Sequence, residues 1–185
     1  MKRNFVITAA VILIGSVLLS SCSAIKKKLN VDIDMTSSNV EFTIPVITTV
    51  GTTDMGEQTI PVNIDSIIKA NNAELAASNI KSVKLKSCTI TLLDGDGQNN
   101  FAALQACSAS FYSNTQTTPV QLASISDNPD VESYNLTLPV NASIDLKDYF
   151  GATSFTYHIT GTSRKTTTKE LHAKATIRYT LNVGL

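Results

Sequence analysis

Apolar and polar residues alternate along most of the chain after residue 30, and this alternation constrains the fold more than any other feature. A period of two is typical of a β-strand with one buried face. The last strand is the clearest case, with apolar residues at Ala173, Ala175, Ile177, Tyr179, Leu181 and Val183. Only 8 glycines and 5 prolines interrupt the chain, so the sequence predicts an ordered, β-rich protein.

The alternating segments predict about eight strands and little helix. We expect a first strand that comprises the alternating segments 31–35 and 40–44, followed by strands at 59–64, 80–93, 106–112, 120–125, 134–140, 155–159 and 173–183. A short helix is expected from Ile67 to about Leu75, capped by Asp65-Ser66, and a helical turn after Asn100. The fold class is therefore all-β, a two-layer antiparallel β-sandwich that is Ig-like in architecture, with a closed barrel as the alternative.

Two local patterns refine this prediction. The polar stretch 161–170, GTSRKTTTKE, separates the last two strands and predicts a β-hairpin. The sequence T-[IL]-P-V-N occurs twice, at 59–63 and at 137–141. Because proline is tolerated at edge strands and strand ends, both copies are expected at corners of the sheets.

The N-terminus has the pattern of a secretory signal. A basic segment, 1–4, precedes the apolar run 5–19, which as a helix would span about 22 Å, short of the ~30 Å hydrocarbon core of a membrane. The following Leu19-Ser20-Ser21-Cys22 resembles the lipobox of bacterial lipoproteins. This resemblance implies cleavage between Ser21 and Cys22 and acylation of Cys22 with fatty acids such as palmitate. The expected domains are the signal peptide 1–21, a lipid-anchored tether 22–30 and one β-sandwich domain 31–185.

The resemblance also implies a location in the cell envelope. Ser23 stands where an aspartate would favour retention in the inner membrane, so the outer membrane is expected. Ser23–Lys28 lacks the acidic residues of a surface-export signal, which favours the periplasmic side. With its lipobox, its IDSIIK segment (64–69) and its closing TGTSRKTTTKELHAKATIRYTL segment (160–181), the chain resembles small Bacteroidota envelope lipoproteins of uncharacterised function. That group provides no catalytic residues to carry over.

Lipidation of Cys22 would leave Cys88 and Cys107 as a pair in an oxidising compartment. Each lies on the apolar face of its predicted strand. A disulfide between them would close a loop of about 20 residues and contribute ~3 kcal/mol on the chain-entropy model. The alternative is two buried free thiols.

No pattern of residues indicates catalysis or a cofactor. The sequence contains no G-x-S-x-G elbow and no phosphate-binding glycine loop, so we expect no enzyme and no cofactor. Asp94–Gly97 fails the spacing of a calcium loop and predicts a turn. His158 and His172, the only histidines, are expected on polar faces as cross-strand neighbours, which is too few ligands for a metal site.

The charge also limits the possible partners. Removal of residues 1–21 takes away Lys2 and Arg3, so the mature charge is (15 − 2) − 15 = −2 and does not favour nucleic acid. We therefore expect a noncatalytic envelope protein that presents its sandwich to another envelope protein. The expected contact loops are Ser163–Lys169, with Arg164 and Lys165, and Ser126–Glu132, with Asp127 and Asp130.

Two other functions remain open. A glycan-binding surface lipoprotein would need aromatic rings outside the core, and Tyr112, Tyr134, Tyr149 and Phe150 are the candidates. A hydrolase of unrecognised type is the third alternative.

Overall fold

The computed structural model describes residues 30–185, so the predicted signal peptide 1–21, the lipidation site Cys22 and the tether up to residue 29 lie outside the described residues. The strands are β1 (Asn30–Ile44), β2 (Thr52–Pro61), β3 (Ile80–Leu92), β4 (Leu104–Ser113), β5 (Val120–Ile125), β6 (Asn135–Leu138), β7 (Ser154–Ser163) and β8 (Leu171–Gly184). The helices of this part are α3 (Ile64–Asn71) and the short 3-10 helices η2 (Ala77–Asn79), η3 (Phe101–Ala103) and η4 (Lys147–Tyr149).

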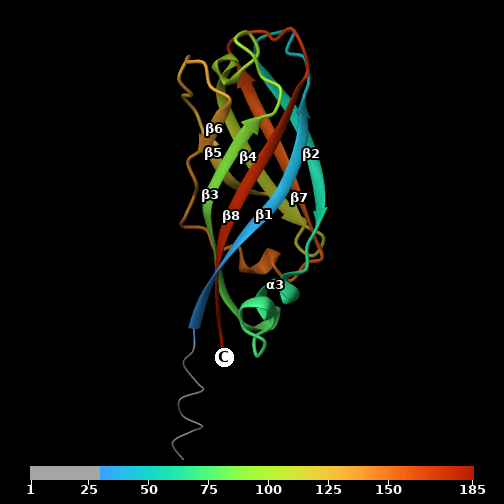
Figure 1. The fold of residues 1–185 in the computed structure, drawn as a ribbon, viewed down its shortest axis with the longest axis vertical. Helices are drawn as coiled ribbons and strands as arrows, with labels where there is room; N and C mark the ends of the chain where they lie inside the picture. Colours follow the sequence, from blue (N-terminus) through green and yellow to red (C-terminus); the bar gives the residue numbers. More distant parts are fainter. Residues whose placement is uncertain (1–29) are drawn as a thin grey trace, which may run out of the picture.

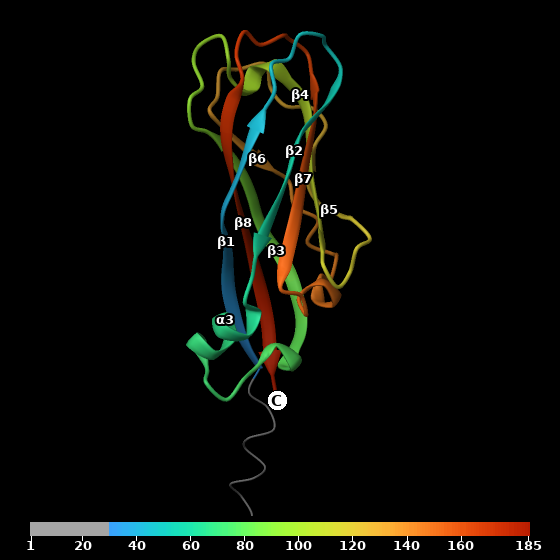
Figure 2. The same ribbon diagram turned by 90° about the vertical axis from the view of Figure 1, so that its right-hand side faces the viewer.

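The strands form two four-stranded antiparallel sheets, which pack face to face as an elongated sandwich (Figures 1 and 2). One sheet has the order β1-β8-β3-β6 and the other has the order β2-β7-β4-β5. This arrangement confirms the predicted all-β sandwich. The chain passes from one sheet to the other at every connection except that between β4 and β5. Eight strands in this order make a jelly roll, in contrast to the seven or nine strands of an immunoglobulin domain.

The predicted hairpin between the last two strands is wrong. β7 pairs with β2 and β4, whereas β8 pairs with β1 and β3, so 164–170 connects the two sheets. Alternation shows which face of a strand is buried, but it does not show which strand lies beside it.

Segments 31–35 and 40–44 form one strand, β1, as predicted, with a bulge between Ser37 and Val40. Two other local predictions need correction. No strand is predicted between residues 45 and 58, but β2 begins at Thr52 and has a bulge at Gly56, whose φ is +113°. The helix α3 begins at Ile64 because the Asn63 side chain accepts the Ser66 N–H at 3.0 Å. By contrast, Asp65 accepts the N–H of Ala77 at 2.9 Å.

The core lies between the sheets and is rich in aromatic rings. Its largest fully buried side chains include Tyr157, Tyr179, Phe111, Phe150 and Phe155. The Phe111 ring packs against Phe155 edge-on, with centroids 5.4 Å apart, and stacks on Tyr157 at 5.8 Å. The Tyr157 hydroxyl also reaches across the core to Ser37 of β1, at 3.1 Å. The alternating apolar residues of the sequence thus form the predicted core.

Cys88 of β3 and Cys107 of β4 are buried free thiols in the two facing sheets. Burial raises the pKa of each thiol to about 12. Of the two alternatives that the sequence left open, the structure describes the buried thiols.

The two long sides of the sandwich differ. Along one side β5 is joined to the segment after β6, because Ser124 N–H donates to Pro139 O and Asn141 N–H donates to Leu122 O, both at 3.1 Å. Along the other side β1 and β2 are edge strands, and each contains a bulge. The repeated prolines, Pro61 and Pro139, end β2 and follow β6, which are both edge strands. The prediction that they mark corners of the sheets is confirmed.

Candidate functional site

Four connections meet at the end of the sandwich opposite Asn30 and the C-terminus (Figure 1). They are β1–β2 (45–51), β3–β4 (93–103, including η3), β5–β6 (126–134) and β7–β8 (164–170), and we call this surface the loop end. Both predicted contact loops belong to it.

The β7–β8 loop holds the loop end together. Thr167 exchanges two hydrogen bonds with Ile47, each 2.9 Å long, and the Thr168 N–H donates to the Asn99 side chain at 2.8 Å. The Arg164 N–H donates to Ala103 O at 2.8 Å. Because these hydrogen bonds join different connections, the loop end is cross-linked rather than a set of independent loops.

The two predicted contact loops also contact each other. Lys165 forms an ion pair with Asp130, and the Arg164 guanidinium donates to the backbone oxygen of Asn128. Asp127 is exposed, as expected for a contact residue. Ser163 was predicted to be exposed, but it is only 3% exposed because its hydroxyl is bonded to the backbone of Gly51.

Asp94 and Asp96 order the β3–β4 loop in the way that a turn requires. Asp96 accepts the N–H groups of Gln98 and Asn99 at 2.9 Å each, and it pairs with Lys169 at 3.0 Å. The hydrogen bond from Lys169 holds the pKa of Asp96 well below its usual range. The hydrogen bonds and the ion pair of the Asp96 carboxylate are made with groups of the protein, which agrees with a turn rather than a calcium loop.

The two histidines lie in different sheets, so the expected cross-strand pair is wrong. His158 of β7 contacts Asp54 at 3.1 Å, whereas the Nδ1 atom of His172 in β8 lies 2.8 Å from Asp94. The hydrogen bond between His172 and Asp94 raises the pKa of His172 and lowers that of Asp94. Among residues 30–185, no group of three or more His, Cys, Asp or Glu side chains could hold a metal ion.

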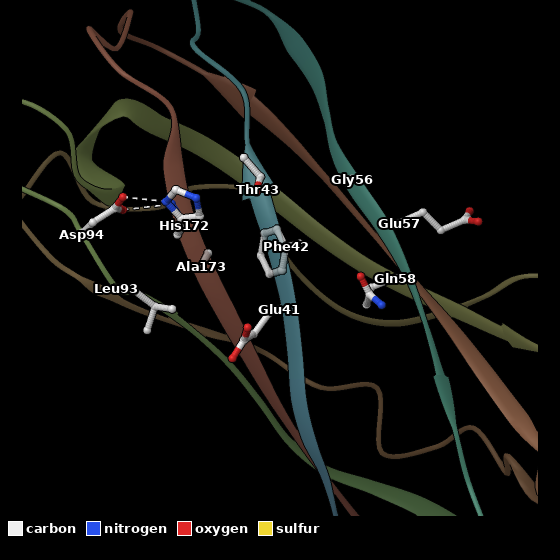
Figure 3. Close-up of a pocket in the computed structure, with 10 residues that line it drawn as sticks. All are labelled: Glu41, Phe42, Thr43, Gly56, Glu57, Gln58, Leu93, Asp94, His172 and Ala173. Carbon is white, nitrogen blue, oxygen red and sulfur yellow. Dashed lines mark hydrogen bonds and ion pairs between the residues drawn. The ribbon is translucent and has the colours of Figure 1, made fainter.

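A groove of about 660 Å³ lies beside the loop end, between the edges of β1 and β2 (Figure 3). Residues 41–43 of β1 and 56–58 of β2 form its two walls, and Leu93, Asp94 and His172 close it on the side of β3 and β8. Sequence reasoning missed this groove because it depends on which edges face each other. Leu93 was the available signal, since it is an apolar residue on the solvent side of a strand end.

The aromatic residues proposed for glycan stacking do not form a platform. Phe150 is fully buried, and Tyr149 packs against Phe111 with ring centroids 5.0 Å apart. Tyr112 belongs to β4 and donates to Glu57 at 3.0 Å, whereas Tyr134 belongs to the β5–β6 loop. These rings are divided between the core and two separate surfaces, so the structure does not bring them together.

Exposed apolar side chains concentrate at the loop end. Among residues 30–185, the exposed large hydrophobic residues are Val46, Val50, Leu93, Val131, Tyr134 and Leu185, with exposed fractions of 37–66%. All of these except the C-terminal Leu185 lie in the loop end. Within the same residues, no helix is long and apolar enough to cross a membrane.

Comparison with known proteins does not identify a family, because no protein-family model and no curated protein matches the chain. Among solved structures, the chain is similar to a chain of the infectious bursal disease virus Gx strain, with 13% identity and a TM-score of 0.41 over 84% of this chain and 33% of the viral chain. It is also similar to a "putative secreted protein" from Eubacterium rectale, with 14% identity and a TM-score of 0.42 over 85% of this chain and 41% of that chain. The chain thus spans less than half the length of either protein. TM-scores below 0.5 assign no function to it.

Proposed function

We propose that this chain is a noncatalytic lipoprotein of the bacterial outer membrane, anchored through acylated Cys22 and facing the periplasm. In this proposal the jelly roll holds its loop end away from the membrane, where the loop end binds another envelope protein. The anchor rests on the resemblance of Leu19–Cys22 to a lipobox, which lies outside the described residues.

The observation that carries this proposal is the polarity of the domain. Asn30, which follows the proposed tether, lies at the end opposite the four loops (Figure 2). Those loops carry Val46, Val50 and Val131, which are 43%, 55% and 66% exposed. Aliphatic side chains that are exposed on one surface favour protein binding there. Because the loops of this surface are cross-linked, little conformational entropy is lost on binding.

The long sides of the sandwich are less suited to binding. Hydrogen bonds close the side between β5 and β6, and bulges interrupt both β1 and β2 on the other side. Bulges on edge strands are a common means of preventing edge-to-edge pairing. This supports a partner at the loop end rather than along the sheets.

The noncatalytic part of the proposal rests on the surroundings of the histidines. His158 contacts Asp54, and His172 contacts Asp94 and, at 3.9 Å, Glu170. Within residues 30–185, no serine, threonine or cysteine side chain is hydrogen-bonded to either imidazole. The arrangement of an activated nucleophile beside its base is therefore not seen there.

Site-specific photocrosslinking in native envelopes tests this function. A photoreactive residue at Val131 or Val50 should capture one defined protein, whereas the same residue at Glu74, beyond α3 at the opposite end, should not. Capture of the same protein from all three positions, or of lipid alone from the loop end, would contradict the proposal.

A further inference from the structure

A second groove lies near the end of the sandwich that contains Asn30, where α3 packs beside β1 (Figure 2). It has a volume of about 440 Å³, and we call it the α3 groove. Residues 35–37 of β1 form one wall, and residues 60–63 with Ser66 and Ile67 form the other. Among residues 30–185, no charged side chain lines this groove, so it suits an apolar ligand.

The α3 groove has aliphatic walls that are already in place. Ile60, Val62 and Ile67 line it and are half-buried, so each leaves apolar surface open to solvent. Helix α3 is held on the core by Ile68, which is fully buried. The backbone of Val62 is fixed as well, because its N–H donates to Thr153 O at 2.9 Å. An apolar chain could therefore bind in this groove without reorganisation of its walls.

The position of the α3 groove relates it to the proposed anchor. The five residues from Asn30 to Met35 span about 17 Å of β1. The eight residues from Cys22 to Asn30 reach at most about 29 Å. Because the second length exceeds the first, Cys22 can lie beside the wall of the α3 groove in its own molecule.

We propose that the α3 groove binds one acyl chain of Cys22 when the domain is away from a membrane. The acyl chain lies against Ile60, Val62 and Ile67, and its polar linkage to Cys22 stays in solvent. This inference rests on the proposed function, because the ligand is the proposed anchor itself.

A membrane competes with the α3 groove for the acyl chain. Each buried CH₂ group adds to the stabilisation of the bound chain, and a bilayer buries the whole chain, whereas an open groove covers only part of it. The acyl chain therefore stays in the bilayer when one is present and occupies the groove in water. The groove thus reduces the apolar surface that the lipidated protein exposes in the aqueous periplasm.

Photoaffinity labelling tests the site without depending on the anchor. The protein is the mature chain with Cys22→Ser, and the probe is palmitate that carries a diazirine on its acyl chain. Labelling should map to residues 35–37 and 60–67. Pentanoate with the same diazirine should leave the protein unlabelled, because it buries too few CH₂ groups.

Two variants separate the α3 groove from the rest of this end. In Ile67→Asp the labelling by palmitate should fall about tenfold, because a charge then stands in the groove. Ile67 lies in the first turn of α3, where an aspartate is compatible with the helix. Ser78→Asp is the matched control, since Ser78 is exposed outside the groove, and it should be labelled as fully as the parent protein.

The lipidated protein gives a second measurement that needs no variant. When its own acyl chains carry the diazirine, irradiation in dilute, detergent-free buffer should crosslink them to residues 35–37 or 60–67 of the same molecule. Irradiation in phospholipid vesicles should crosslink them to lipid instead.

Four results would overturn the inference. They are no labelling of the α3 groove by palmitate, equal labelling of the loop end, undiminished labelling of folded Ile67→Asp, and an equal loss in Ser78→Asp. If Ile67→Asp does not fold, the labelling map of the parent protein decides. An acylated Cys22 with an unlabelled groove would remove this inference alone, whereas an unmodified Cys22 would remove the proposed anchor as well.

Discussion

The Tyr157 hydroxyl lies 3.1 Å from the Tyr179 hydroxyl, and this contact joins the two sheets at the centre of the core. Tyr157 belongs to β7 and Tyr179 to β8, the two strands that the sequence predicts as a hairpin. They meet across the sandwich instead. Burial raises the pKa of Tyr157 to about 12, so both phenols stay neutral and hydrogen-bonded at physiological pH.

Loss of the Tyr157 hydroxyl should destabilise the domain. Tyr157→Phe removes hydrogen bonds to Ser37 and Tyr179 and leaves polar groups buried without a partner, so the free energy of unfolding should fall by about 1–3 kcal/mol. Chemical denaturation of Tyr157→Phe, Tyr179→Phe and the double variant measures this effect. The double variant should lose less than the sum of the single losses, because the two changes remove one shared contact. Strict additivity would show that the hydroxyls do not interact.

The cysteines should be inaccessible until the protein unfolds. In a Cys22→Ser variant, a thiol reagent should modify neither Cys88 nor Cys107 in the native protein and both in denaturant, since each is buried with a pKa of about 12. Absence of reactive thiols after unfolding without reductant would show instead that the disulfide forms.

The same thiols predict a loss of stability at alkaline pH. Their folded pKa of about 12 lies above the ordinary value of 9.0, so above pH 9 the unfolded chain releases protons that the folded chain retains. The contribution of the two protonated thiols to the free energy of unfolding is fully present below pH 9 and decreases as the pH rises toward 12. Urea midpoints measured between pH 7 and 11 should fall above pH 9. The decline should be shallower in Cys88→Ala/Cys107→Ala, and an identical decline would assign the effect to other groups.

The ion pair between His172 and Asp94 should be visible in a histidine titration. Its hydrogen bond raises the pKa of His172 above 6.5 and lowers that of Asp94 below 3.8. The pair therefore stabilises the fold at pH values between the lowered pKa of Asp94 and the raised pKa of His172. This stabilisation is lost as the pH rises above the pKa of His172 or falls below the pKa of Asp94. Nuclear magnetic resonance should show the pKa of His172 falling in Asp94→Asn. Equal values in the native protein and the variant would exclude the contact in solution.

Two variants distinguish the observed start of α3 from the predicted one. Asn63→Ala removes the side-chain cap on the Ser66 N–H and should cost about 1 kcal/mol of stability. Ser66→Ala should cost little, because its exposed hydroxyl is not the cap. Denaturation midpoints measure both, and a larger loss in Ser66→Ala would restore the predicted cap.

The predictions that succeeded depend on the local alternation of apolar and polar residues. The segment 120–125 was predicted with its observed bounds, and 80–93 differs from β3 by one residue, because strands with one buried face carry their own signal. The sequence carries no comparable signal for which strands pair with each other, so β7 was predicted to pair with β8. Burial of Ser163 and Thr167 was likewise invisible, since it depends on Gly51 and Ile47 in a distant loop. The groove, formed by edges of different sheets, was missed for the same reason.

The central claim is that Cys22 anchors this domain to a membrane with its loop end facing away. Intact mass spectrometry of the protein extracted from native membranes tests this claim most directly. The predicted result is a chain that begins at Cys22 and carries the added mass of two or three acyl chains. A chain that retains residues 1–21, or begins at Cys22 with an unmodified thiol, would contradict it.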